Sequence, residues 1–335
     1  MINIGVIGYG YWGTNLVRNF ITNPNTRVLS VCDLNPKNLE KLKILYPSLK
    51  TTNNSKEIIN DTLIDAIVIA TPVTSHFDLS MAALKLGKHV FVEKPMTFNS
   101  DQARKLIEQA ARKRLTLMVD HTFIYTGAVR KIRELVKTPF FGEPTFFDST
   151  RINLGLFQYD INVIWDLAVH DLSIMIYIFD IMPVRVSATG FSHIIGQPEN
   201  VAYLTMFFAK DFIAHINVSW LSPVKIRKTL IGGSKQMIVY DDLEASEKLK
   251  VYNKGITVTN TPDDIRKILI SYRTGDLWSP KVNNIEALQT AVSHFVNCIN
   301  GLEGAESNGE EGLKIVRILE AASKSIRNDG VPVDI

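Results

Sequence analysis

The stretch that most constrains the fold is the first 33 residues, which run from a buried strand through a glycine-rich turn to an acidic residue. Asn3 to Ile7 has a strand pattern and Asn15 to Ile21 a helix pattern, and the G-x-G-x-x-G run Gly8-Tyr9-Gly10-Tyr11-Trp12-Gly13 lies between them. The glycines permit a tight turn, close approach of a pyrophosphate and close helix–strand packing, and the helix N-terminus attracts the anion. Asp33 ends the next strand, where a carboxylate accepts hydrogen bonds from ribose hydroxyls. The combination predicts a dinucleotide site; a glycine turn beside a surface aspartate is the structural alternative.

Asp33 also bears on the choice between NAD and NADP. A 2′-phosphate beside that carboxylate would meet like charge, and the next residues, Leu34 and Asn35, offer no cation. Lys37 is near enough to weaken the distinction. The sequence therefore favours NAD over NADP.

The first third of the chain alternates short apolar strands with helical segments, which is typical of a parallel sheet with crossover helices. The predicted strands after the first span residues 27–32, 66–70, 89–92 and 116–119, and the predicted helices span 15–21, 36–45, 76–86 and 100–112. We therefore expect an α/β Rossmann domain, a doubly wound parallel sheet, over residues 1–121.

The pattern changes after residue 121. A long helix is predicted near Val163 to Phe179, and several strands with hairpin-like spacing follow it. A chain of 335 residues is also longer than a single core usually supports. We expect residues 122–335 to form a C-terminal α+β domain with a large, mostly antiparallel open sheet, which binds substrate and mediates oligomerisation.

Lys94 follows a predicted strand of the first domain, in the run Val92-Glu93-Lys94-Pro95. Ligands of open α/β sheets bind beyond the carboxyl ends of the strands, so a lysine there could hold a substrate oxygen and stabilise alkoxide charge. A solvated loop lysine is an equally good interpretation of this position alone.

Asp166 and His170 are four residues apart on the predicted long helix and so share one face. A histidine beside a carboxylate is a common general base, because histidine as a residue type titrates near neutral pH. A satisfied core histidine or a helix-surface ion pair explains the same spacing. Asp171, one position further on, is expected to face elsewhere.

Bulk composition excludes several other classes of protein. The net charge of +3 gives no electrostatic case for nucleic acid or membrane binding, and no apolar run is long enough for a membrane span. Cys32 and Cys298 provide neither a disulfide framework nor metal-ligand spacing. We expect a cytoplasmic protein without a metal site.

Together these features resemble the Gfo/Idh/MocA family of oxidoreductases over essentially the whole chain. The motifs that carry the resemblance are Gly8–Gly13, Ala70-Thr71-Pro72 with Ser75-His76, Gly87-Lys88-His89-Val90-Phe91-Val92-Glu93-Lys94-Pro95, Trp165-Asp166 to His170-Asp171, and the closing helices. The resemblance implies a Rossmann domain followed by an open-sheet domain, with sheets paired in homodimers or homotetramers.

The resemblance also assigns roles to residues. Lys94 and His170 would be catalytic with Asp166 in support, and Asn153 and Trp165 would join Asp166 and His170 at the substrate. The implied cofactor-binding residues are Gly8, Gly10, Tyr11, Trp12, Gly13, Asp33, Thr71, Pro72, His76, Glu93 and Lys94. Many polyol-oxidising members carry arginine where this chain has Ile124, which disfavours an inositol-type substrate. The run from Arg151 to Gln158 is more similar to that of members acting on nucleotide-linked sugars, as in the nucleotide-sugar 3-dehydrogenase branch.

The function expected from these features is NAD-dependent hydride transfer to or from a hydroxyl-bearing carbon of a sugar or nucleotide-linked sugar. His170 would take the hydroxyl proton while Lys94 stabilises the alkoxide. One alternative is a non-catalytic NAD-binding regulator of the same fold, against which the presence of Lys94 and His170 argues. Another is an imine or enone reductase, for which a histidine base is less needed.

Overall fold

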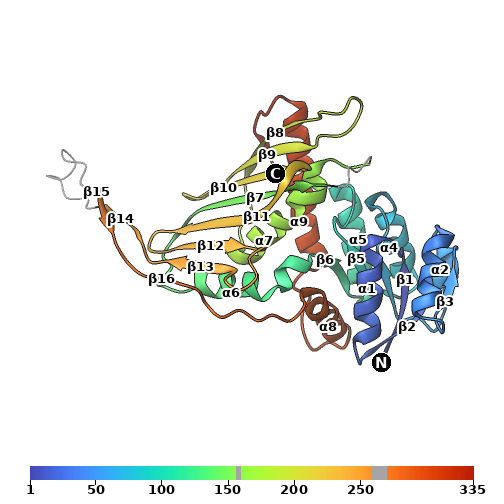
Figure 1. The fold of residues 1–335 in the computed structure, drawn as a ribbon. Coiled ribbons are helices and arrows are strands. Elements are labelled where there is room, and N and C mark those ends of the chain that lie inside the picture. Colours follow the sequence, from blue (N-terminus) through green and yellow to red (C-terminus); the bar gives the residue numbers. More distant parts are fainter. Residues whose placement is uncertain (156–159, 259–269) are drawn as a thin grey trace. The chain divides into compact units, whose positions relative to one another are not determined.

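The chain forms two compact units in the computed structural model, which describes residues 1–155, 160–258 and 270–335 (Figure 1). The first unit contains Met1–Tyr125 and Ile285–Glu320, and the second contains Thr126–Asn284 and Ala321–Ile335. The expected division at residue 121 lies four residues before the end of the first segment, and residues 285–320 pack with the first unit, not the second. Helix α8 (Ala287–Ile299) shows the reason: the ring of its Phe295 lies 5.3 Å from the ring of Phe91 and 6.3 Å from that of Phe20, centroid to centroid.

The first unit is built on a six-stranded sheet in which every neighbouring pair of strands is parallel. Its spatial order is β3-β2-β1-β4-β5-β6, from β1 (Ile2–Ile7), β2 (Thr26–Cys32), β3 (Lys50–Thr52), β4 (Ala66–Ile69), β5 (His89–Glu93) and β6 (Leu117–Asp120). The predicted doubly wound parallel sheet is therefore confirmed. The order reverses between β1 and β4, and ligands of such sheets bind at the carboxyl ends of the strands beside this point.

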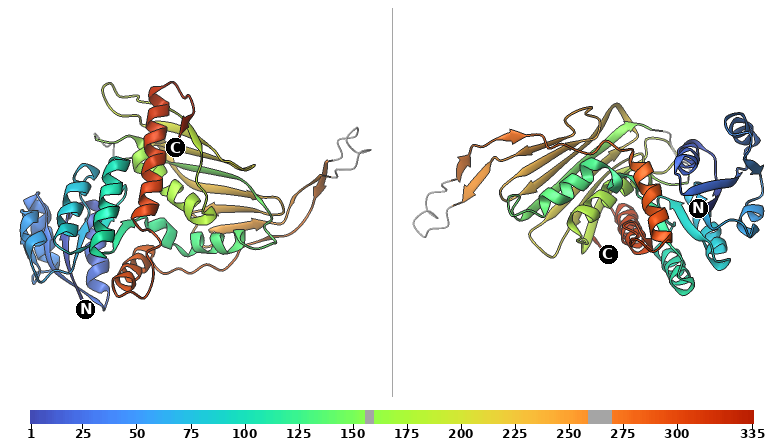
Figure 2. Two further views of the ribbon diagram at one scale, coloured as in Figure 1. Left: turned by 180° about the vertical axis from the view of Figure 1, so that it is seen from behind. Right: turned by 90° about the horizontal axis from the view of Figure 1, so that it is seen from below.

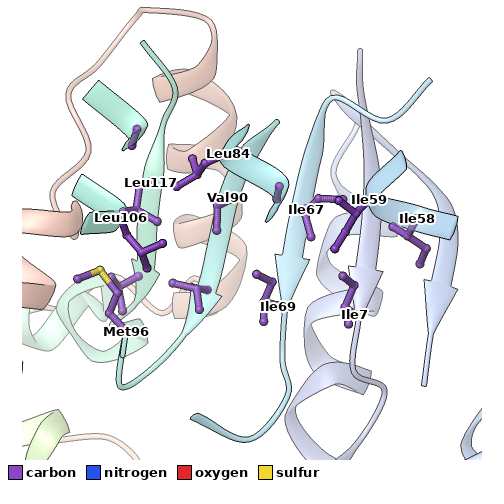
Figure 3. Close-up of a cluster of buried hydrophobic side chains, with 14 of the residues drawn as sticks. Ile7, Ile58, Ile59, Ile67, Ile69, Leu84, Val90, Met96, Leu106 and Leu117 are labelled. Atoms are coloured by element: carbon purple, nitrogen blue, oxygen red, sulfur yellow. The ribbon is translucent and has the colours of Figure 1, made fainter. Parts of the chain in front are cut away.

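Buried aliphatic side chains fill the space between this sheet and its helices. The helices are α1 (Tyr11–Thr22), α2 (Pro36–Leu45), α3 (Ser55–Asn60), α4 (His76–Lys85) and α5 (Ser100–Lys113), with short 3₁₀ turns η1 (Val73–Ser75) and η2 (Thr122–Tyr125). Figure 3 shows Ile67, Ile69 and Val90 on the strands beside Leu84 and Leu106 from the helices. Burial on both faces explains why these strands are almost uninterrupted apolar runs.

The second unit is built on a nine-stranded mixed sheet. In spatial order its strands are β16 (Leu277–Trp278), β13 (Leu249–Tyr252), β12 (Met237–Asp241), β11 (Leu221–Gly233), β7 (Pro144–Leu154), β10 (Ile213–Ser219), β9 (Val201–Phe207), β8 (Arg185–Phe191) and β17 (Val333–Asp334). Neighbours are antiparallel except β7 and β10. The expected mostly antiparallel sheet is thus confirmed. A further pair, β14 (Gly255–Val258) and β15 (Ile270–Arg273), forms a two-stranded ribbon.

Helices α6 (Gly127–Val136) and α7 (Val169–Phe179) lie against one face of the nine-stranded sheet (Figure 2). The long predicted helix from residue 163 begins differently than expected, because Ile164–Ala168 forms a π-helical turn, η3, before α7 starts. Such turns are rare and occur often at functional sites. Helix α9 (Gly309–Arg327) runs from the first unit into the second.

None of the described helices combines the length and the apolar character needed to cross a bilayer.

Candidate active site

The glycine-rich turn has the geometry that its sequence spacing requires. Gly8 has φ +100°, a left-handed conformation that side-chain-bearing residues avoid. A Cβ on Gly13 would lie 2.2 Å from the carbonyl oxygen of Gly8, so helix α1 could not pack as closely against the turn. A Cβ on Gly10 would meet nothing within 4 Å, which leaves open space above the backbone at the start of α1.

A cavity of about 550 Å³ lies beside this turn, within the first unit. Five predicted cofactor residues line it: Gly8, Gly10, Asp33, Thr71 and Pro72. Five further lining residues were not predicted from the sequence: Leu34, Ser55, Thr74, Asp78 and Leu79. They come from the loop after β2, from α3, from η1 and from the first turn of α4, and sequence spacing gave no sign that these segments converge.

Asp33 is held in place by the surrounding backbone. Its Oδ2 accepts a hydrogen bond from the Tyr9 N–H (2.6 Å), and its Oδ1 accepts from the Asn35 N–H (2.8 Å) and from Asn38 Nδ2 (3.2 Å). The carboxylate is thereby fixed at the cavity wall. A carboxylate can accept about four hydrogen bonds, so a ribose hydroxyl still has a place to donate.

The other predicted cofactor residues do not line this cavity. Tyr11 is 84% exposed, and Gly13 serves the packing described above. Both ring nitrogens of the buried His76 lie against carbonyl oxygens: Nδ1 is 2.8 Å from Pro95 O, and Nε2 is 2.7 Å from Thr71 O. The His76 side chain therefore joins the turn after β4 to the turn after β5.

Asp120, at the end of β6, was not identified from the sequence. Its Oδ2 accepts a hydrogen bond from Trp12 Nε1 (2.7 Å), and its Oδ1 accepts from Thr122 Oγ1 (2.6 Å). The side chain is 1% exposed, and burial raises the pKa of Asp120. The indole of Trp12, on α1, is therefore hydrogen-bonded to the carboxyl end of β6. The only available sequence signal was that Asp120 follows a buried strand at its carboxyl end.

His121 lies next to Asp120 and is 2% exposed. Among the described residues, neither of its ring nitrogens has a hydrogen-bond partner. Burial lowers the pKa of His121 to about 3, and the nearby Lys94 ammonium acts in the same direction. The imidazole is therefore neutral at neutral pH.

This burial predicts acid sensitivity of the fold. His121 binds a proton near pH 6.5 in the unfolded chain but only near pH 3 when folded, so stability is full above pH 6.5 and falls as the pH drops toward 3. We expect a loss of about 2 kcal/mol between pH 7.5 and pH 5 from His121. Urea unfolding of wild type and His121→Leu at both pH values measures it. The variant should show a shallower loss, although His76 and His89, whose pKa values burial also lowers, retain part of it. An equally steep loss in the variant would contradict the assignment.

The predicted residues Asn153, Trp165, Asp166 and His170 lie in the second unit. Asp166 lies in the π-helical turn η3, and its Oδ2 accepts a hydrogen bond from Trp220 Nε1 at 3.0 Å. Trp220 is 1% exposed; its N–H donates to Asn200 O and its carbonyl accepts from Gly155 N. A fixed indole therefore orients the carboxylate one turn before His170. Trp220 was not identified from the sequence, because it is 54 positions from Asp166.

Trp165 and Asn153 have more ordinary surroundings. Trp165 is 6% exposed, and its Nε1 donates to Ser323 Oγ (2.9 Å) of α9. Asn153 is half-buried on β7. The run from Arg151 toward Gln158 lies partly outside the described residues, at 156–159. Lys94 belongs to the first unit, and Asp166 and His170 belong to the second.

Asp171 faces the sheet, away from the side of the helix expected for His170. It accepts hydrogen bonds from Arg151 Nε (2.7 Å), Arg151 Nη2 (3.0 Å) and Ser149 Oγ (2.9 Å), all on β7. Arg151 and Asp171 are 3% and 1% exposed. Burial opposes the charge of Arg151, but Asp171 outweighs it and raises the pKa of Arg151 overall.

Family models match both parts of the chain. Residues 2–121 match the model described as "Oxidoreductase family, NAD-binding Rossmann fold", and residues 129–239 match the GFO/IDH/MocA C-terminal domain. The chain belongs to the Gfo/Idh/MocA family of oxidoreductases. The resemblance seen in the sequence motifs is thereby confirmed.

Known proteins are similar to the chain over different lengths. The uncharacterized oxidoreductase YdgJ of Escherichia coli is 34% identical over 148 residues, 44% of this chain and 42% of that protein. UDP-N-acetylglucosamine 3-dehydrogenase of Acidithiobacillus ferrooxidans is 26% identical over 76% of both chains. A solved structure of that enzyme superposes with a TM-score of 0.82 over 97% of this chain and 98% of that one, at 21% identity. GenD2 from gentamicin A biosynthesis, solved in complex with NAD, gives 0.83 over 100% and 96%, at 18% identity.

Proposed function

We propose that the protein is an NAD-dependent dehydrogenase that acts on a hydroxyl-bearing carbon of a sugar or nucleotide-linked sugar. The observation that carries this proposal is the cavity beside the glycine turn, where Asp33 is fixed at the wall and the described lining residues include no lysine or arginine. A carboxylate without a cation suits the free ribose hydroxyls of NAD and repels the 2′-phosphate of NADP. GenD2, whose structure superposes on this chain, was solved in complex with NAD.

The residues present fit a dinucleotide. Gly8 and Gly10 would lie along the pyrophosphate, Asp33 would accept from the adenosine ribose, and Thr71 and Pro72 would border the cofactor on the other side. Bound NAD would supply the nicotinamide carbon that exchanges hydride with the substrate.

The protein side chains handle the proton and the charge. His170 takes the proton from the substrate hydroxyl, and Lys94 donates a hydrogen bond to the oxygen and stabilises its developing negative charge. The hydrogen bond from Trp220 holds the Asp166 carboxylate in one orientation, just before the start of α7, the helix that carries His170. In the reverse direction the same groups return the proton to the oxygen.

The proposed substrate class is supported by a relative of known activity and by the residue at position 124. UDP-N-acetylglucosamine 3-dehydrogenase of Acidithiobacillus ferrooxidans is 26% identical over 76% of the chain. Ile124, in place of the arginine of many polyol-oxidising members, is 3% exposed and apolar, so it offers no donor to a free polyol. We therefore place nucleotide-linked sugars before inositols.

The proposal is tested by following reduced-nicotinamide absorbance while the protein and NAD meet panels of nucleotide sugars, free sugars and polyols. We expect turnover with a nucleotide sugar. Turnover with inositols alone would overturn the substrate class. No turnover with any panel, while calorimetry shows that NAD binds, would favour a regulator or an imine reductase instead.

Asp33 should control cofactor choice. We expect Asp33→Ser to weaken NAD binding about tenfold, because the ribose loses a charged acceptor worth about 1.5–3 kcal/mol at most. The same change should improve NADP binding, because the repulsion of the 2′-phosphate is removed. Calorimetric titration of both cofactors measures the ratio, and Asp65→Asn, at the opposite end of the sheet, is the matched control. An unchanged ratio of the two affinities would show that Asp33 does not contact the ribose.

A further inference from the structure

Two hydroxyl groups contact each other in the turn that follows β4. Thr71 Oγ1 lies 2.7 Å from Ser75 Oγ, and either atom could supply the proton for this contact. The Ser75 hydroxyl also lies 2.9 Å from the carbonyl oxygen of Pro72, which can only accept a hydrogen bond. Thr71 and Ser75 both line the cavity beside the glycine-rich turn. The direction of these two bonds therefore decides what the turn presents to a ligand.

The carbonyl oxygen of Pro72 fixes the direction of both bonds. A hydroxyl has one proton, and that of Ser75 lies toward this oxygen. The proton between the two hydroxyls then comes from Thr71, which donates to Ser75 Oγ. In the opposite arrangement two oxygen atoms would face each other at 2.9 Å without a proton between them. Thr71 thus has its proton turned toward Ser75, and only its lone pairs remain, to accept hydrogen bonds.

The backbone that carries the two hydroxyls is held in place as well. The Ser75 N–H donates to the same carbonyl oxygen of Pro72 at 3.0 Å, so main chain and side chain together close the turn η1. Nε2 of the buried His76 lies 2.7 Å from the carbonyl oxygen of Thr71. The Thr71 hydroxyl therefore lies on a preorganised turn, which costs little entropy to order when a ligand binds.

A second polar group fixed at the wall of this cavity is also an acceptor. The Asp33 carboxylate accepts three hydrogen bonds from the protein and can accept a further one. Acceptors at Thr71 and Asp33, on the walls of one cavity, suit a ligand that brings several donors. The adenosine half of NAD has such donors in its ribose hydroxyls and its 6-amino group.

We propose that Ser75 is a positioning residue that orients the Thr71 hydroxyl as an acceptor for a donor group on the adenosine half of the cofactor. The proposal rests on the dinucleotide site of the proposed function, but not on the sugar substrate or on hydride transfer. A purely structural role is the alternative, because serine hydroxyls often bond a nearby backbone carbonyl. The two roles differ in whether the effect of Ser75 on cofactor affinity depends on Thr71.

Calorimetric titration with NAD separates these roles in four proteins: wild type, Ser75→Ala, Thr71→Val and the double variant. We expect each single variant to bind NAD about fivefold more weakly, the loss typical of one neutral hydrogen bond. The double variant should also lose about fivefold, because without the Thr71 hydroxyl Ser75 has nothing to orient. Independent losses would multiply to about 25-fold. Ser75→Thr, which keeps the hydroxyl, should bind NAD as wild type does.

Thr138→Ala is the matched control. The Thr138 hydroxyl donates to the carbonyl oxygen of Leu135, three residues earlier, at 2.7 Å, as that of Ser75 does to Pro72. Thr138 belongs to the second unit, so its removal should leave NAD affinity unchanged.

Two nucleotides without a nicotinamide locate the donor. We expect the variants to lose the same factors with ADP, which keeps the adenosine and the diphosphate. Inosine diphosphate has an oxo group in place of the 6-amino group. Losses that persist with it assign the donor to the ribose, and losses that disappear assign the donor to the 6-amino group; both results support the proposal.

Three results would overturn the proposal: a loss of about 25-fold in the double variant, unchanged NAD affinity in Ser75→Ala, or losses with NAD that are absent with ADP. A lower urea midpoint of Ser75→Ala at unchanged NAD affinity would show the structural role alone. Failure of the proposed function is distinct, because the wild-type protein would then bind NAD but turn over no sugar, and the titrations would still decide the role of Ser75. A wild-type protein that binds neither NAD nor ADP would overturn both.

Discussion

Replacing Lys94 or His170 by alanine should lower turnover about a thousandfold in each case, once a substrate is in hand. A positioned general base typically contributes 10²- to 10⁴-fold, and one donor to a developing oxyanion contributes about 10²- to 10³-fold. In the proposed mechanism the two side chains act on the same hydroxyl, one removing its proton and the other stabilising the charge that remains. Steady-state rates, measured with saturating NAD, give both losses.

The double variant distinguishes a shared reaction step from two independent defects. Groups that act as a unit are strongly non-additive, so Lys94→Ala/His170→Ala should be little worse than the poorer single variant. Two matched controls should leave turnover unchanged: Lys85→Ala, at an exposed position on α4, and His215→Ala on β10. Cofactor titration of each variant separates a loss of chemistry from a loss of NAD. Wild-type turnover in either single variant would remove that residue from the mechanism.

Features of the fold that depend on residues close together in the sequence could be predicted from it. Gly8, Gly10 and Gly13 lie within six residues. The backbone geometry gives a steric reason for Gly8, through its positive φ, and for Gly13, through its close approach to Gly8. Uninterrupted apolar strands predicted a sheet covered on both faces, and the order of strands and helices predicted that the sheet is parallel. Asp33 was identified because its distance from the turn is set by one helix and one strand.

Contacts between distant segments were not predictable from one sequence. The indole of Trp12 meets Asp120 across 108 positions, and that of Trp220 meets Asp166 across 54. Nothing in the composition of either segment identifies its partner. The π-helical turn at Ile164–Ala168 also lacked a signal, since its residues have an ordinary helical pattern. The return of α8 to the first unit depends on how Phe295 packs, which periodicity does not encode.

The largest effect on stability should follow from removing Asp171. The ion pair of Arg151 and Asp171 has two hydrogen bonds and is almost fully buried between β7 and α7. Asp171→Leu leaves a guanidinium buried without its carboxylate, which typically costs about 3–5 kcal/mol. Whole domains are stable by only about 5–15 kcal/mol, so the second unit of this variant is expected to unfold at much lower urea concentration.

The matched control is the double variant Arg151→Met/Asp171→Leu, which removes both charges. Replacing a buried ion pair by apolar side chains of similar size is often neutral, because neither charge then has to be desolvated. Ser149 retains a partner in this variant, since its Oγ lies 3.2 Å from Thr229 Oγ1. Urea unfolding followed by tryptophan fluorescence, to which Trp165 and Trp220 of the second unit contribute, should therefore show the double variant close to wild type and the single variant far below it. Two results would contradict this prediction: a single variant whose free energy of unfolding is within about 1 kcal/mol of wild type, or a double variant as unstable as the single one. Solvent would then reach Arg151. The ion pair would not hold α7, which carries His170 as its second residue, against the sheet.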